Sequence, residues 1–279
     1  TLTLYTLTKH IEKVFPFVRE VILAPSFSET EFEIYKSNAI ERFKINLEKV
    51  SFIARKEFMS TIYEGDHPYG SNVELTDYDK LDINDIRKFY KDNYNLANCR
   101  ILASGKVDNS VINTLNTSFG KEKITSNPNT EIEIPSDTPA SKTLYIEKEN
   151  ALQSAIRIGR IFPNKLHKDY FGLQILNTVL GGYFGSRLMN NIREDKGYTY
   201  GIGSGILSLK NSGYFFISTE VGSDVTKDAL LEIYKEIEII RTEEISKEEL
   251  DLVKNYLLGQ LLKSCDGPFN MGEMFENVH

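Results

Sequence analysis

The stretch Leu180–Gly205, LGGYFGSRLMNNIREDKGYTYGIGSG, carries the local signals that decide the fold of this part of the chain. Its first glycines indicate the end of a helix and a tight turn. A short helix then ends in a charged turn at Gly197 and passes into a tyrosine-rich strand. Because this turn folds the strand against the helix end, we expect Arg193 and Tyr200 to face one site. Arginine offers a fork of donors to a peptide carbonyl or carboxylate, and tyrosine adds a hydroxyl.

The same residues also permit a purely structural interpretation. In that interpretation Arg193 pairs with Glu194 or Asp195, and Tyr200 packs in the core. Composition alone leaves both interpretations open and favours the structural one.

The sequence around this stretch predicts alternating strands and helices. Expected helices cover Thr8–Ala24, Glu29–Glu48, Phe52–Tyr63, Asn84–Tyr94, Asn109–Phe119 and Lys168–Leu180, with two more after Thr226. Expected strands cover Thr1–Thr6, Arg100–Ser104, Thr143–Ile146, Ser154–Ile161, Tyr198–Leu207 and Gly213–Glu220. This order predicts an α+β fold, with helices on one face of a mainly antiparallel sheet.

An internal repeat organises the chain, because residues 8–43 align without gaps on residues 226–261. Each copy reads as helix, break, helix, and each second helix opens with a capping box. The two boxes are Ser28-x-x-Glu31 and Ser246-x-x-Glu249. The repeat predicts two tandem homologous domains, with about 75 residues of the first lying before Thr1.

These observations divide the chain into three parts. Residues 1–120 are predicted to be the C-terminal part of a first domain that is truncated at its N-terminus. Residues 121–141, rich in Pro, Thr, Ser and Asn, are the predicted linker. Residues 142–279 are the predicted second domain, incomplete at its C-terminus.

Composition narrows the possible partners and compartments. The 279 residues are 41% hydrophobic and 26% charged, and no apolar run is long enough for a transmembrane helix. A net charge of −7 without a basic stripe argues against nucleic acid. Cys99 and Cys265 are expected to be buried free thiols. The protein is expected to be soluble, and the sequence does not choose between cytoplasm and periplasm.

No complete catalytic motif occurs in the sequence. The four histidines have no zinc-ligand spacing, and surface or turn positions are expected for them: His10, His67, His167 and His279. The GGxxG at Gly181 matches neither a dinucleotide-binding nor a phosphate-binding loop. No GxSxG is present, and neither cysteine adjoins a candidate base.

The stretch Leu180–Gly205 resembles the second domains of the insulinase/pitrilysin family of zinc peptidases, which includes the mitochondrial processing peptidase. Residues 66–70 (DHPYG), 79–94 and 100–107 are similar to the later part of the family's first domain. The resemblance implies paired α/β-roll domains that close on an unfolded peptide. It also implies that zinc is bound by HxxEH and a distal Glu in the first domain, an inverzincin arrangement. Arg193 and Tyr200 match the family's pair that contacts substrate and stabilises the tetrahedral intermediate.

The resemblance breaks down at the metal. HxxEH would lie before Thr1, and the expected distal Glu position holds Arg42. Glu41, one residue away, is turned by about 100° on a helix, so Glu41 and Glu33 are only weak candidates. We therefore expect this chain to bind no metal and to be inactive alone, with zinc in a partner subunit or in the missing N-terminal segment.

Three functions follow from the resemblance. The first is an inactive subunit of a heterodimeric zinc metallopeptidase, which binds peptide and supplies Arg193 and Tyr200 to a partner's zinc site. Its partner would be a zinc-bearing homologous subunit or a second copy of the chain. The second is an active zinc metalloendopeptidase whose HxxEH lies upstream. The third is a non-enzymatic structural subunit.

Overall fold

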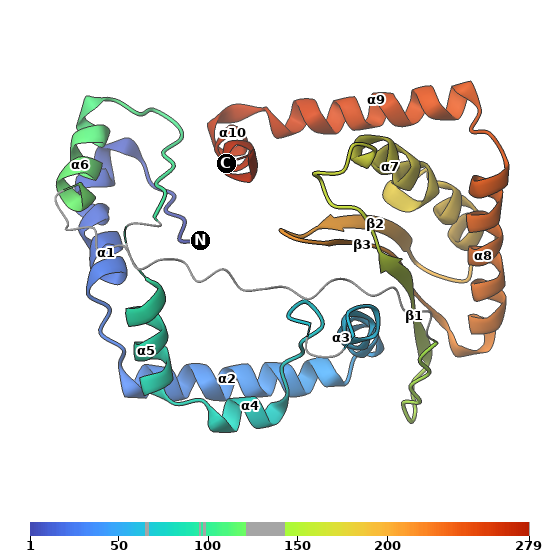
Figure 1. Cartoon of the computed structure of the whole chain (residues 1–279), viewed down its shortest axis with the longest axis horizontal. Helices are drawn as coiled ribbons and strands as arrows, with labels where there is room; N and C mark the ends of the chain where they lie inside the picture. The colour runs from blue at the N-terminus through green and yellow to red at the C-terminus, as the bar shows by residue number, and fades with distance from the viewer. Residues whose placement is uncertain (65–66, 95, 97–98, 121–142, 279) are drawn as a thin grey trace. The chain divides into compact units, whose positions relative to one another are not determined.

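A computed structural model describes residues 1–64, 67–94, 96, 99–120 and 143–278 (Figure 1). The described residues form two compact units. The first contains residues 1–40, 75–120 and 258–278, and the second contains residues 41–74 and 143–257. The predicted linker, residues 121–141, lies outside the described residues, so the predicted domain division stays a prediction.

The second unit is built on a three-stranded antiparallel sheet of order β1-β3-β2. Its strands are β1 (Gln153–Ile161), β2 (Ile202–Ser208) and β3 (Gly213–Gly222). The register pairs Arg157 with Ser218 and Gly205 with Phe216. The strands predicted in this region and the α+β class are confirmed, because alternating apolar residues mark each strand.

Helical segments cover one face of this sheet (Figure 1). They are α7 (Tyr170–Asn177), the π-helical segments Thr178–Gly182 and Met189–Asp195, the short 3-10 helix Ser223–Val225, and α8 (Thr226–Thr242). The core between them contains the fully buried side chains of Leu188, Ile192, Ile217, Val221 and Ile233. Burial of these aliphatic side chains is the main stabilisation of the unit.

The opposite face of the sheet is covered in part by α3 (Val50–Ile62), which lies beside β1 in Figure 1. Phe58, Ile62 and Tyr63 form an aromatic cluster with Tyr214 of β3. Tyr63 is 1% exposed, and its hydroxyl lies 2.9 Å from the hydroxyl of Ser212. Residues almost 100 positions before the first strand of the sheet thus belong to its core.

The regular elements in the described part of the first unit are all helices. Its elements are the 3-10 turn Thr8–His10, α1 (Ile11–Leu23), α4 (Leu75–Lys80), α5 (Ile83–Asn93), α6 (Asn109–Phe119) and α10 (Gly267–Val278). Two long helices, α2 (Glu29–Leu47) and α9 (Lys247–Ser264), have residues in both units. The helices predicted from periodicity and caps are confirmed, whereas α4 and α10 were not predicted.

Three predicted strands do not form: Thr1–Thr6, Arg100–Ser104 and Thr143–Ile146. A strand is stable only when a neighbour completes its hydrogen-bond ladder. No described residue forms a strand ladder with these segments, and Ile101 and Leu102 are 47% and 44% exposed. The expected burial of the thiols is also wrong, because Cys99 is exposed and Cys265 is half-buried.

Candidate substrate-contacting site

Arg193 lies in the π-helical segment Met189–Asp195, just before the turn at Gly197, whose φ is +66°. Its Nη1 donates to Oε1 of Glu194 at 2.7 Å, and the guanidinium lies 4.8 Å from the ring centre of Phe184. The side chain remains 32% exposed. This ion pair is the one that the structural interpretation of the sequence predicted, but it leaves part of the guanidinium open to solvent.

Tyr200 is 95% exposed, so the alternative prediction that it packs in the core is wrong. The turn that carries it is fixed by the hydroxyl of Thr199. This hydroxyl donates to the carbonyl oxygen of Glu220 at 2.7 Å and accepts from the Gly201 N–H at 3.0 Å. The hydroxyls of Thr219 and Thr199 are 2.9 Å apart. The backbone on both sides of Tyr200 is therefore anchored while its ring extends into solvent.

Tyr200 borders a shallow polar cleft of about 340 Å³. The cleft is lined by Gln153, Thr199, Tyr200, Gly201, Ser218, Thr219 and Glu220. Arg193 is not among the lining residues, and its contacts are with Glu194 and Phe184. Arg193 therefore precedes the turn at Gly197 and Tyr200 follows it, and the contacts that Arg193 makes in the described part of the chain are not with Tyr200.

The segment that carries Arg193 is held to α9 by a two-point ion pair. Arg187 donates to Glu249 from Nε at 2.9 Å and from Nη2 at 2.7 Å, and both side chains are mostly buried. The hydrogen bonds to Glu249 raise the pKa of Arg187 above its ordinary value. The predicted capping box forms only in half. Ser246 accepts from the Glu249 N–H at 3.1 Å, but the Glu249 carboxylate binds Arg187.

A second contact holds the same segment to α8. The side-chain amide of Asn191 donates to Glu236 at 2.7 Å and to Glu232 at 3.1 Å. The hydrogen bond from Asn191 lowers the pKa of Glu232 below its ordinary value. Together with the Arg187 ion pair, this contact fixes the backbone that ends at Arg193.

The candidate metal ligands do not assemble into a metal site. Glu33, Glu41 and Arg42 are exposed on α2, and Glu41 pairs with Lys44 at 3.6 Å. Across the ranges that the structure describes, no group of three His, Cys, Asp or Glu side chains is placed to hold a metal ion. Within the described part of the chain, Glu33, Glu41 and Arg42 therefore form no zinc site by themselves.

The histidines occupy different environments. His10 and His167 are exposed as predicted, and His279 lies outside the described residues. His67 occupies a turn as predicted, but it is only 4% exposed. Its ring stacks on Tyr63, and its Nδ1 accepts from the N–H of Tyr69. The aromatic cluster under the sheet accounts for this burial.

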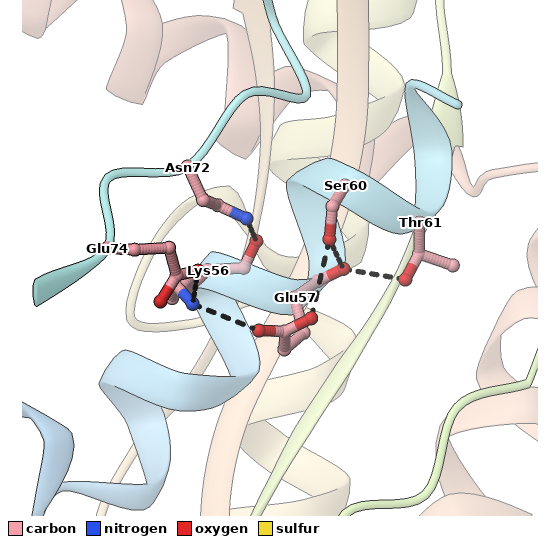
Figure 2. Close-up of polar contacts among 6 residues, drawn as sticks. All are labelled: Lys56, Glu57, Ser60, Thr61, Asn72 and Glu74. Carbon is pink, nitrogen blue, oxygen red and sulfur yellow. Dashed lines mark hydrogen bonds and ion pairs between the residues drawn. The ribbon is translucent and has the colours of Figure 1, made fainter. Parts of the chain in front are cut away.

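A charged cluster on α3 was not predicted from the sequence (Figure 2). Lys56 Nζ lies 2.6 Å from Glu74 and 3.4 Å from Glu57, and the Asn72 amide donates to the Lys56 carbonyl oxygen at 3.0 Å. The hydrogen bond to Glu74 is the main reason why the pKa of Lys56 is raised above its ordinary value. Lys56 and Glu74 are 18 positions apart, which matches no helical spacing, so the sequence pattern did not predict their ion pair.

Residues 80–257 match the family described as the peptidase M16 inactive domain, and the chain belongs to this family. The resemblance seen in the sequence is thereby confirmed. Within the described residues, no helix has the length and apolar character needed to cross a membrane.

The names of similar proteins include both zinc proteases and a non-peptidase homolog. An uncharacterized zinc protease of Bacillus subtilis is 24% identical over 262 residues, covering 93% of this chain and 63% of the relative. A non-peptidase homolog from Helicobacter pylori is 22% identical over 269 residues, covering 92% of this chain and 60% of the relative. A solved structure of a Helicobacter pylori protease shares the fold with a TM-score of 0.85 at 20% identity. The match covers 98% of this chain and 67% of the solved chain. The chain spans about 60% of the length of these curated relatives.

Proposed function

We propose that this chain is the non-catalytic subunit of a two-part zinc peptidase. It binds an extended peptide and presents Tyr200 and Arg193 to a zinc site held by a homologous partner. The observation that carries the proposal is the placement of Tyr200, which is 95% exposed on an anchored turn at the rim of a polar cleft. Tyrosine is enriched among the contact residues of protein interfaces, and here the backbone on both sides of the ring is anchored.

The ion pair that Arg193 forms with Glu194 is weak, and this supports the proposal. Glu194 adjoins it in the sequence, and both side chains are partly exposed. Such pairs contribute about 0–1 kcal/mol, so a peptide carbonyl or an oxyanion can replace Glu194 at little cost. The guanidinium fork then supplies donors to charge that develops in the transition state.

The residues of α2 support assignment of the metal to another subunit. Arg42 stands where the family resemblance expects a zinc-binding Glu, and a guanidinium repels a divalent cation. The name of the Helicobacter pylori relative, a non-peptidase homolog, agrees with a chain that does not hydrolyse peptides alone.

The test is reconstitution of the full-length protein with a zinc-bearing homologue from the same organism. Arg193→Ala or Tyr200→Phe is expected to reduce peptide turnover by about 10²-fold, the cost of one lost transition-state donor. Assembly, measured by analytical ultracentrifugation, should be unchanged. Tyr145→Phe and Arg241→Ala are matched controls, because both side chains are exposed and lie outside the cleft. Normal turnover in both site variants would refute the proposal.

A second candidate is an active zinc peptidase whose metal ligands lie elsewhere in the full-length protein. The name of the Bacillus subtilis relative, a zinc protease, favours it. Metal analysis separates the candidates, because this one requires one zinc per chain and turnover without a partner. The non-catalytic subunit requires neither.

A further inference from the structure

Arg157 of β1 occupies an unusual position on the face of the sheet that α3 partly covers. Its guanidinium lies near two aromatic rings, 5.3 Å from the ring centre of Phe58 and 4.7 Å from that of Phe216. Contact with the two rings stabilises its charge. The donor edge of the fork remains the part that can bind another molecule.

No carboxylate neutralises this guanidinium among the described residues, since none forms an ion pair with it within 4 Å. Its Nε is buried and has no hydrogen-bond partner in the same part of the chain. Burial lowers the pKa of Arg157, and the nearby cation Arg55 adds to this effect against a favourable contribution from Tyr214. A partly buried cation without an opposite charge costs free energy, and a bound anion would offset this cost.

Arg157 lies next to the cleft at Tyr200 in the sheet but is not one of its lining residues. It pairs in register with Ser218, which lines the cleft together with Tyr200 and Glu220. Side chains two apart on a strand share a face, so Ser218 lies on the same face as Phe216, whose ring contacts Arg157. A peptide that extends out of the cleft along this face, past Ser218 toward Phe216, would meet the guanidinium.

We propose that Arg157, assisted by Arg55, binds a carboxylate of an extended peptide that occupies the cleft at Tyr200. The inference rests on the proposed peptide-binding function and adds a substrate class, namely peptides with an acidic group beside the segment at Tyr200. A planar carboxylate matches the guanidinium fork at two points, which a neutral side chain cannot do. The carboxylate can come from an Asp or Glu side chain or from the free C-terminus of the peptide.

Fluorescence anisotropy with the full-length protein tests the inference. Three labelled twelve-residue peptides of Gly, Ser and Ala serve as probes: a neutral amidated peptide, the same peptide with a central Glu, and a neutral peptide with a free C-terminus. We expect a carboxylate peptide to bind at least 10-fold more tightly than the neutral amidated one. Preference for the Glu peptide identifies a side-chain carboxylate, and preference for the free terminus identifies a chain end.

Variants of Arg157 assign the preference to this residue. Arg157→Met keeps an apolar stem beside the two rings and is expected to abolish the preference, while affinity for the neutral peptide stays unchanged. Arg160→Met is the matched control, because Arg160 is exposed on the same strand and points to the opposite face. Arg55→Gln changes an exposed residue of α3 and is expected to reduce the preference about 3-fold, even if the Arg157 variant does not fold.

The outcomes that contradict the inference differ from those that contradict the function. Equal affinity for the neutral and carboxylate peptides would overturn the role of Arg157 alone, as would a preference that survives both Arg157→Met and Arg55→Gln. Absence of binding by every peptide would overturn both the inference and the proposed peptide-binding function.

Discussion

Arg187 and Glu249 join the segment that ends at Arg193 to the first turn of α9 through two parallel hydrogen bonds of 2.9 and 2.7 Å. Their side chains are 18% and 28% exposed, so the pair is shielded from most of the solvent. The same glutamate occupies the third position after the cap Ser246. The carboxylate of Glu249 therefore connects the first turn of α9 to the segment that carries Arg193.

Loss of this ion pair should destabilise the second unit. We expect Arg187→Met to lower the free energy of unfolding by roughly 1–3 kcal/mol, because Glu249 would keep a mostly buried charge without its partner. Urea denaturation measures the change. Arg241→Met, which breaks an exposed pair with Glu238, should cost less than about 1 kcal/mol. Equal costs for the two variants would contradict the assigned burial.

Gly181 should not tolerate a side chain. A Cβ atom at Gly181 would lie 2.6 Å from Oγ and 2.7 Å from the backbone N of Ser204. We expect Gly181→Ala to lower the free energy of unfolding by about 1–3 kcal/mol, because strand and helix must separate. Gly172→Ala on α7 meets nothing within 4 Å and should be neutral or stabilising by up to about 1 kcal/mol. Calorimetry of both variants tests the close approach.

Lys56 should make stability depend on pH in the alkaline range. Its pKa in the folded chain is raised above the ordinary value of 10.5, mainly by the hydrogen bond to Glu74. The charged lysine therefore stabilises the fold fully below pH 10.5, and this stabilisation is lost as the pH rises through the raised pKa. As the pH rises above about 10.5, the wild type should lose more unfolding free energy than Lys56→Met. Lys168→Met, at an exposed lysine, should match the wild type.

Tyr200→Phe should separate function from stability. Because the ring is 95% exposed, removal of its hydroxyl should change the free energy of unfolding by less than about 0.5 kcal/mol. Thr199→Val, by contrast, removes hydrogen bonds to Glu220 and Gly201 and should cost about 1–2 kcal/mol. A large loss of stability in Tyr200→Phe would mean that the hydroxyl has a structural role.

Local signals predicted most of the helices and the sheet. The helix Asn109–Phe119 has the predicted bounds, because Asp108 caps it and a glycine follows it. The strands that form complete their ladders with one another: β2 and β3 follow each other in the sequence, and β1 pairs with β3 across an intervening helical region. The segment Arg100–Ser104 has equally strong strand character, but strand formation also needs a partner, which local pattern cannot supply.

The sequence predicted the elements around the candidate site but not how its side chains are arranged. Helix, turn and strand around Gly197 lie as expected, and Arg193 forms the pair with Glu194 that its neighbours allowed. The exposure of Tyr200 depends on Thr199, whose hydroxyl reaches Glu220 on another strand. Arg157 gave no signal in the sequence, because its aromatic neighbour Phe58 is distant along the chain and meets it only through tertiary packing.

The position of α3 has a practical consequence for work with fragments of this chain. A recombinant product that starts at residue 143 would contain all three strands but would lack Phe58, Ile62 and Tyr63, leaving Tyr214 and Phe216 bare. Exposed aromatic surface of this kind promotes aggregation. A synthetic peptide of residues 41–74, added in trans, should restore solubility to such a product, as in fragment complementation.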